Sequence, residues 1–174
     1  GTPAALKATH DAAGFFPDVG GPDPARKPGS AAGPGHHLTV GTVRIRVLSD
    51  LHLEVRPLSL PGVEADLVVL AGDIGNGAAG IEWAREQFDV PVLFVAGNHE
   101  YYEGEFHAVQ QSLRAAAAGS NVHLLDCDVL TLGGVRFLGC SLWTDYSLAP
   151  REQRAAVIER SRKFNPDHNC IRMG

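Results

Sequence analysis

The sequence has few cysteines and no long apolar run. Its three cysteines are odd in number and form no CxxC pair, so a disulfide framework is not expected and a reducing compartment fits: Cys127, Cys140 and Cys170. No apolar stretch approaches the ~20 residues that a membrane-spanning helix requires. The N-terminus also lacks the basic start and apolar stretch of a secretory signal. We therefore expect a cytoplasmic protein with no membrane partner.

Charge of either sign is also modest. Charged residues make up 20% of the chain, with a formal net charge of −5 and a pI near 5.9. This balance gives no strong signal for nucleic acid as a partner. Hydrophobic residues make up 44%, which is ordinary for a globular domain with a buried core. The chain begins with Gly1 and its single methionine is Met173, so we do not expect a complete, conventionally initiated reading frame. The oligomeric state is not indicated.

The chain divides into a tail and a domain. Residues 1–42 are rich in glycine, proline and alanine and have no apolar periodicity. Such a segment cannot offset its ordering entropy, so it is predicted to be disordered. The pair His36–His37 within it is interpreted as solvated linker residues. A single domain is predicted over residues 43–174.

Alternating apolar runs and helical stretches predict an α/β domain. Strands are predicted over residues 43–48, 67–71, 92–96, 122–125, 129–132 and 135–139. Helices are predicted over residues 78–88, 103–118 and 150–163, before an irregular end. The early alternation indicates a parallel sheet, whereas Gly133–Gly134 between the last two strands is typical of a tight hairpin.

Metal-capable side chains follow each of the first three predicted strands. They are Asp50 and His52, then Asp73, then Asn98 with His99 and Glu100. The carboxyl ends of neighbouring parallel strands meet at one edge of a sheet, where ligands bind. Residues that are far apart in the sequence are therefore expected to share one site.

The chemistry of this set suits divalent metal ions. In an extended chain, Asp50 and His52 point the same way and can face one ion. The carboxylate of Asp73 can bridge two ions, and Asn98 offers a neutral oxygen. Mixed nitrogen and oxygen ligands fit manganese, iron or zinc. Two such ions would attract a phosphate ester and stabilise the charge that develops in an in-line displacement. Glycines 72 and 97 are expected to let the backbone turn sharply before Asp73 and Asn98.

These motifs resemble a known family. Asp50-x-His52, Gly72-Asp73 and the run 97–100 resemble the first three motifs of the calcineurin-like metallophosphoesterases, and residues 139–144 resemble a segment of bacterial members. The resemblance implies a sandwich of two mixed sheets flanked by helices. It also implies hydrolysis of phosphomonoesters or phosphodiesters by a hydroxide that two metal ions activate.

The resemblance assigns a role to each residue. It implies that Asp50 and His52 bind the first metal, that Asp73 bridges both metals, and that Asn98 binds the second. His99 is expected to protonate the leaving-group oxygen, a role that imidazole suits near neutral pH. For Glu100, three interpretations stay open: it orients that imidazole, holds the loop, or is a solvated acid.

The later motifs of this family are missing from the chain. No Gly-His-x-His follows Glu100, and His107, His123 and His168 lack the family's context. We therefore expect a domain that is incomplete at its C-terminus. Its second metal is predicted to bind weakly and its phosphoesterase activity is predicted to be low, because metal affinity depends on ligand number.

Two other functions compete with hydrolysis. The run 75–80 is a literal GxGxxG, which in a dinucleotide-binding domain would hold pyrophosphate at a helix N-terminus. It begins beyond the strand, after Asp73, and the acidic residue expected after the next strand is replaced by the run 96–98. The second alternative is a non-catalytic metal-binding or scaffold module, which the missing motifs favour. The identity of the phosphoester substrate depends on loops outside the metal cluster.

Overall fold

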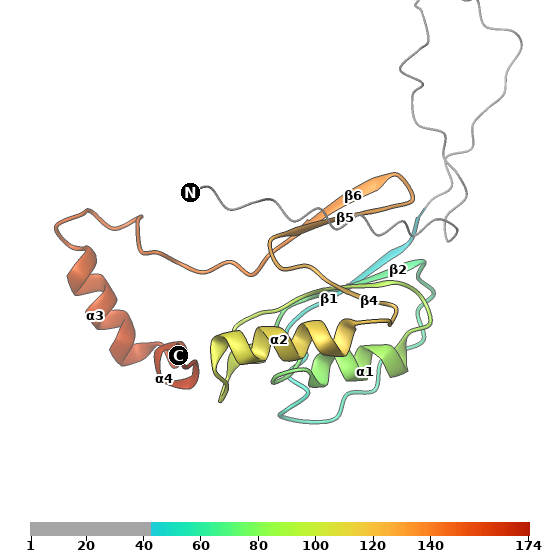
Figure 1. Ribbon diagram of the computed structural model, residues 1–174, viewed down its shortest axis with the longest axis horizontal. Coiled ribbons are helices and arrows are strands. Elements are labelled where there is room, and N and C mark those ends of the chain that lie inside the picture. The colour runs from blue at the N-terminus through green and yellow to red at the C-terminus, as the bar shows by residue number, and fades with distance from the viewer. Residues whose placement is uncertain (1–42) are drawn as a thin grey trace, which may run out of the picture. The chain divides into compact units, whose positions relative to one another are not determined.

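The computed structural model describes residues 43–174 (Figure 1). The predicted disordered tail, residues 1–42 with the pair His36–His37, lies outside this part of the chain. By their contacts the described residues form two units, one of residues 129–137 and a larger one of residues 43–128 and 138–174. Within residues 43–174, no helix is long and apolar enough to cross a membrane.

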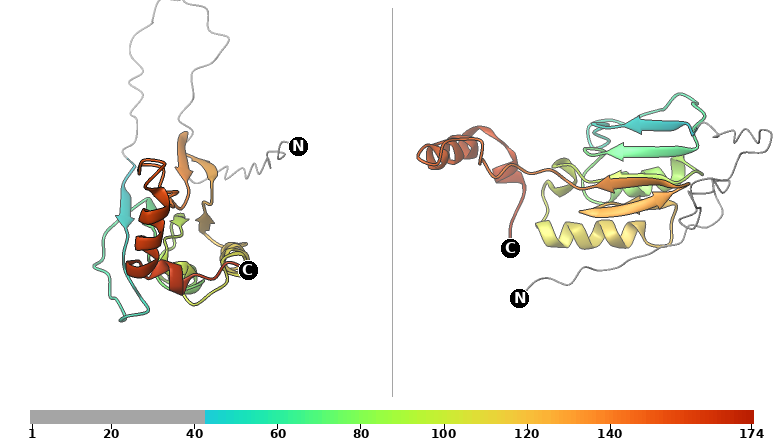
Figure 2. Two further views of the ribbon diagram at one scale, coloured as in Figure 1. Left: turned by 90° about the vertical axis from the view of Figure 1, so that its left-hand side faces the viewer. Right: turned by 90° about the horizontal axis from the view of Figure 1, so that it is seen from above.

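The larger unit is built on a parallel sheet with strand order β1-β2-β3-β4. The strands are β1 Ile45–Leu48, β2 Leu67–Ala71, β3 Val92–Val95 and β4 Val122–Leu124. Leu70 pairs in register with Leu48 on one side and with Phe94 on the other, so the strands end at nearly the same edge. Figure 2 shows β1 and β2 side by side and pointing the same way. The predicted parallel sheet is confirmed.

Two helices cover one face of this sheet. They are α1 Ala79–Gln87 and α2 Phe106–Ala117, and Figure 1 shows both on the same side of the strands. Right-handed crossovers between neighbouring parallel strands place successive helices on one face. Helix α2 begins later than residue 103, because the Glu105 side chain caps it and accepts hydrogen bonds from the N–H groups of His107 and Ala108.

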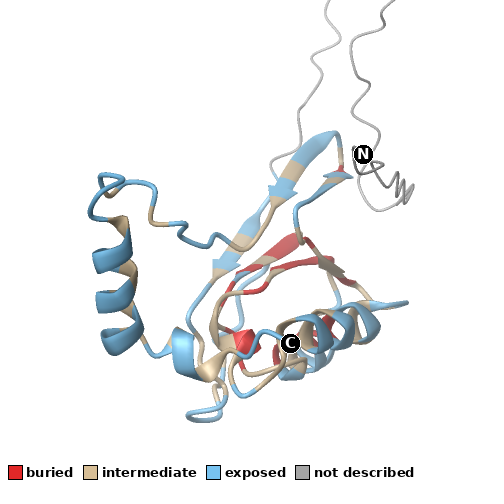
Figure 3. Ribbon diagram, turned by 60° about the vertical axis from the view of Figure 1, so that its left-hand side comes forward, coloured by how far each residue is buried: buried red, intermediate tan, exposed pale blue. Residues whose placement is uncertain are grey.

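The apolar core lies between the sheet and these helices. Its fully buried members come mainly from the two central strands, as the red ribbon in Figure 3 shows: Val68, Leu70, Val92 and Phe94. Helices α1 and α2 add Ile81, Ala84 and Leu113. Central strands that are buried on both faces explain why their sequences are continuous apolar runs.

Strands β5 Asp128–Leu132 and β6 Val135–Gly139 form a two-stranded antiparallel sheet. Gly133 and Gly134 join them with φ values of 54° and 76°, as the hairpin prediction requires. The chain is therefore α/β with parallel and antiparallel pairing. Within residues 43–174, the four-stranded sheet is wholly parallel.

The C-terminal part holds two helices, α3 Arg154–Phe164 and α4 Asp167–Cys170. The prediction of an irregular end was wrong for α4, which begins after Pro166 and whose first N–H, that of Asp167, donates to the side chain of Asn165. Helix α3 begins at residue 154, four residues after the predicted start.

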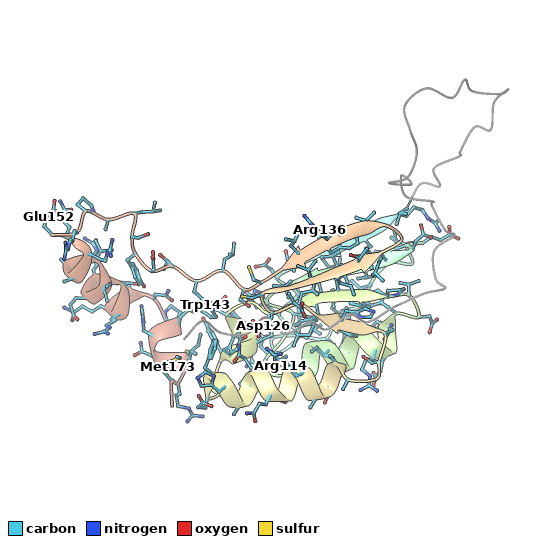
Figure 4. All side chains as sticks on the ribbon, turned by 45° about the horizontal axis from the view of Figure 1, so that its top comes forward. Arg114, Asp126, Arg136, Trp143, Glu152 and Met173 are labelled. Carbon is cyan, nitrogen blue, oxygen red and sulfur yellow. The ribbon has the colours of Figure 1, made fainter. Side chains whose placement is uncertain are left out.

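The Trp143 ring, labelled in Figure 4, contacts the rings of Tyr101 and Phe106.

An ion pair fastens helix α2 to the segment after β4. Arg114 donates to Asp126 across 2.6 Å, and Figure 4 labels both residues. Gln110, on the same face of the helix, donates to the same carboxylate at 3.1 Å. These contacts hold α2 beside the sheet.

Candidate metal centre

The loops that follow β1 and β2 run side by side beyond the ends of the strands. The N–H of Asp50 donates to the carbonyl of Gly72 at 3.0 Å, and the N–H of His52 donates to the carbonyl of Asp73 at 3.1 Å. These bonds continue the strand pairing past the sheet. They bring the residues of the first two motifs together at the carboxyl edge, where the sequence predicted them.

Three predicted ligands converge at this edge. One ligand atom each from Asp50, His52 and Asp73 can be chosen so that all three lie within 4.8 Å of one another. Asp50 is exposed, and the other two residues are partly buried. Two carboxylates and one imidazole in this arrangement fit a first-row divalent ion.

All three residues have a backbone conformation that L-amino acids rarely adopt. The φ angles are 54° at Asp50, 48° at His52 and 56° at Asp73. The extended Asp50-x-His52 backbone that the sequence predicted is therefore wrong. The loop-to-loop hydrogen bonds hold these left-handed turns in place. Such strained residues cluster at functional sites, where the surrounding structure fixes them.

The two glycines before the motifs serve different purposes. Gly72 has a φ of 90°, which agrees with the predicted sharp turn before Asp73. Gly97 has no positive φ, although the chain does bend directly after it, at Asn98, so this bend does not need a left-handed glycine. Glycine is needed at position 97 for lack of space, because a Cβ atom there would overlap the Oδ1 atom of Asp73. The third motif thus approaches the second at van der Waals distance.

The buried side chain of Glu100 connects the loop that follows β2 with the loop that follows β3. It is fully buried, so its interpretation as a solvated acid is wrong. Its carboxylate accepts hydrogen bonds from the backbone N–H groups of Asp73, Ile74, Gly75 and Gly97. Burial raises the pKa of Glu100, and the hydrogen bonds from these N–H groups oppose that shift. This geometry matches the interpretation of Glu100 as a holder of the loop.

The third motif brings His99 and Asn98 to the same edge. The His99 N–H donates to Asp73 Oδ1 at 3.1 Å, and the imidazole rings of His99 and His52 lie 4.4 Å apart. The Asn98 side chain donates from Nδ2 to Tyr102 at 3.1 Å and to Asp167 at 2.8 Å. Sequence reasoning missed Asp167, which lies 69 residues from Asn98 and in no recognisable motif.

Glu54 was also missed. Its Oε1 lies 3.1 Å from Nδ1 of His52 and 2.9 Å from Nδ1 of His99, so one carboxylate orients both imidazoles. Partial burial acts to raise the pKa of Glu54, but hydrogen bonds from its own N–H and from the two histidines outweigh it and lower the pKa. The alternation Asp50-x-His52-x-Glu54 was the available signal.

The remaining histidines and the GxGxxG run lie outside this set. His168 Nε2 lies within hydrogen-bonding distance of Tyr146 and Ser161. The N–H groups of Gly75 and Gly77 already donate to Glu100, so they are not free to cradle a phosphate. Gly80 lies inside α1, where a Cβ would crowd Ile74 and Phe94. The dinucleotide-binding alternative therefore finds no support in this geometry.

Comparison with protein families gives one match. The sequence model of the calcineurin-like phosphoesterases covers residues 43–146, which is more than half of the chain and includes every predicted site residue. A search of curated proteins returned no match. Members of this family hydrolyse phosphoesters and bind divalent metals. The matched range includes the loops that meet at the carboxyl edge of the sheet, and the chain belongs to the calcineurin-like phosphoesterase family.

Proposed function

We propose that this chain is a metal-dependent phosphoesterase that hydrolyses phosphomonoesters or phosphodiesters with the help of two divalent ions. The observation that carries the proposal is the convergence of Asp50, His52 and Asp73, whose ligand atoms lie within 4.8 Å of one another. Their location at the carboxyl edge of a parallel sheet, where ligands bind in α/β folds, supports it. The family's sandwich of two mixed sheets is part of the same proposal.

The side chains divide between two ions. Asp50, His52 and Asp73 would hold the first ion, and Asp73 would share the second with Asn98. His52 would bind through Nε2, because its Nδ1 faces Glu54 at 3.1 Å. This donor set suits manganese, iron or zinc. Three protein ligands against two make the first ion the more tightly held.

Divalent ions at this position supply Lewis-acid activation of water and positive charge for the phosphate oxygens. His99 would donate a proton to the leaving-group oxygen. The Glu54 carboxylate, 2.9 Å from Nδ1 of His99, would accept the Nδ1–H and leave Nε2 to face that oxygen. The loop that Glu100 holds keeps His99 beside Asp73.

Low activity is part of the proposal. Among the predicted residues only Asp73 and Asn98 would bind the second ion, so this ion would be held weakly and turnover would be slow. A non-catalytic metal-binding module remains the alternative. It predicts metal binding without turnover, whereas the proposed phosphoesterase predicts slow, metal-dependent turnover. The same assay therefore separates the two functions.

The test is hydrolysis of p-nitrophenyl phosphate, phenyl phosphate and bis(p-nitrophenyl) phosphate with and without Mn²⁺. Asp73→Asn is expected to abolish the Mn²⁺-dependent rate. His99→Asn is expected to lower kcat by about 10²-fold or more on phenyl phosphate, whose poorer leaving group needs the proton, and less on the nitrophenyl ester. Asp145→Asn, at an exposed position, is the charge-matched control. Turnover that needs no metal, or that survives Asp73→Asn, would contradict the proposal.

A further inference from the structure

Asp167 on helix α4 reaches back to the third motif. Its Oδ1 accepts hydrogen bonds from Asn98 Nδ2 at 2.8 Å and from the Tyr102 hydroxyl at 2.7 Å. Asn98 Nδ2 also donates to the Tyr102 oxygen at 3.1 Å, which closes a three-membered network. Asp167 lies beyond residue 146, where the family match ends. The family match therefore assigns Asp167 no role.

The chemistry of this contact fixes the orientation of the Asn98 carboxamide. An ionised carboxylate only accepts hydrogen bonds, so the amide nitrogen must face Asp167 and the amide oxygen must point away from it. Metal ions bind the oxygen of an asparagine side chain. Without Asp167, the carboxamide would lose the contact that distinguishes its two ends.

We propose that Asp167 is a positioning residue that holds the Asn98 carboxamide with Oδ1 available to the second metal ion. This inference rests on the proposed function, since it requires Asn98 to be a ligand. Tyr102 extends the network to the proton donor. Its ring stacks on the His99 imidazole with centroids 4.3 Å apart and planes at 26°. Asp167 thereby steadies the neighbours of both Asn98 and His99.

Asp167 is itself held firmly enough to position another group. Its Oδ2 accepts from Asn165 Nδ2 at 3.1 Å, while its own N–H donates to Asn165 Oδ1 at 3.0 Å. Both carboxylate oxygens are therefore engaged. Residues whose conformation is locked by such contacts are the ones that orient a ligand effectively.

The segment after Asp167 is anchored to the chain beyond the third motif. Backbone hydrogen bonds join Cys170 and Arg172 to the segment 103–106: Glu103 N–H to Cys170 at 2.9 Å, Arg172 N–H to Gly104 at 3.1 Å, and Phe106 N–H to Arg172 at 2.9 Å. Ile171 packs against the core between these bonds. Helix α4 is thus fastened within a few residues of Asn98.

The test is a double-mutant cycle on Mn²⁺ affinity, measured with the full 174-residue chain by the electron paramagnetic resonance signal of free Mn²⁺. Asp167→Ala is expected to weaken the second, weaker Mn²⁺ site by about tenfold, the loss typical of removing a group that orients a metal ligand. In the Asn98→Ala background, the same substitution is expected to change affinity by less than about twofold, because its target is gone.

Asp167→Asn is the second variant and guards against misfolding. It keeps the size of the side chain but replaces one carboxylate oxygen with an NH₂ group. In one orientation this NH₂ group faces the donors of Asn98 and Tyr102. In the other it faces the Nδ2 of Asn165, whose amide is fixed because its oxygen accepts from the N–H of residue 167. It should lose affinity like Asp167→Ala. Asp145→Asn, which removes one exposed charge in the same C-terminal segment, should stay within about twofold of the wild type.

The outcomes separate the two proposals. An equal loss from Asp167→Ala in both backgrounds would mean a general structural effect and would overturn the positioning role. Unchanged Mn²⁺ affinity in Asp167→Ala, or in Asn98→Ala, would also overturn the positioning role. If Asp50→Asn still lost Mn²⁺ binding in that case, the proposed metal site itself would remain supported. Mn²⁺ binding by the wild type no stronger than by Asp50→Asn would overturn both.

Discussion

Among the residues outside the proposed ligand set, Glu100 should be the one whose loss most disturbs the site. Its carboxylate accepts four backbone N–H groups, two at each oxygen, with distances of 2.7 and 3.1 Å at Oε2 and 2.8 and 3.4 Å at Oε1. Glu100→Gln keeps the shape but turns one oxygen into a donor. Two backbone donors then face an NH₂ group inside the protein.

The magnitude follows from these contacts. Two hydrogen bonds to a charged acceptor contribute roughly 3–6 kcal/mol together. Part of this loss is offset, because the neutral amide of glutamine avoids the cost of burying a charge. That cost is the reason why burial raises the pKa of Glu100. We expect Glu100→Gln to lower the free energy of unfolding by about 2–4 kcal/mol. Mn²⁺ affinity should fall with it, because the Asp73 N–H loses its fixed acceptor.

The assay is urea unfolding followed by the fluorescence of Trp83 and Trp143. The matched control is Glu105→Gln at the half-exposed N-cap of α2, where water can replace a lost acceptor and the cost should stay below about 1 kcal/mol. A Glu100→Gln protein within about 0.5 kcal/mol of the wild type, or no less stable than Glu105→Gln, would refute the reasoning.

Three further predictions concern packing and titration. Gly97→Ala should lower the free energy of unfolding by about 1–3 kcal/mol in urea and weaken Mn²⁺ binding, because its methyl group collides with Asp73 Oδ1. Phe94→Ala should lower it by about 3–5 kcal/mol, because this ring is fully buried in the central strand β3. Burial and the neighbouring carboxylate of Asp167 raise the pKa of Tyr102 to about 12, so Asp167→Asn should move it down, as read from tyrosinate absorbance against Tyr102→Phe.

Each of these has its own check. Gly62→Ala, where a Cβ meets no atom within 4 Å, should leave stability within about 0.5 kcal/mol, and an equal loss at both glycines would contradict the collision. Leu142→Ala, at a residue that is 90% exposed, is the control for the core. A Tyr102 pKa unmoved by Asp167→Asn would mean that burial alone sets it.

The parallel sheet was predictable because its cause is local. Leu67–Ala71 and Val92–Val95 are continuous apolar runs, and only a strand buried on both faces suits such a run bounded by turn residues. The convergence of Asp50 and Asp73 followed from strand order alone. No long-range contact had to be known.

The conformation of the loops was not predictable, because its cause is distant. The left-handed turn at Asp50 is held by a bond to the carbonyl of Gly72, in a loop that follows another strand. Pattern reasoning assumed an extended chain there. Asp167 was beyond reach for the same reason, since its contact with Asn98 spans 69 residues and uses no motif. Glu54, two residues after His52, was within reach of the alternation that singled out His52.

The measurement that tests the central claim most directly is a crystal structure of the chain soaked with Mn²⁺ and recorded at a wavelength where manganese scatters anomalously. We expect an anomalous peak within coordination distance of Asp50, Nε2 of His52 and Asp73, with a weaker second peak beside Asp73 and Oδ1 of Asn98. Density at the first position should vanish in Asp50→Asn. Manganese bound elsewhere, or no peak among these residues, would contradict the proposed metal centre.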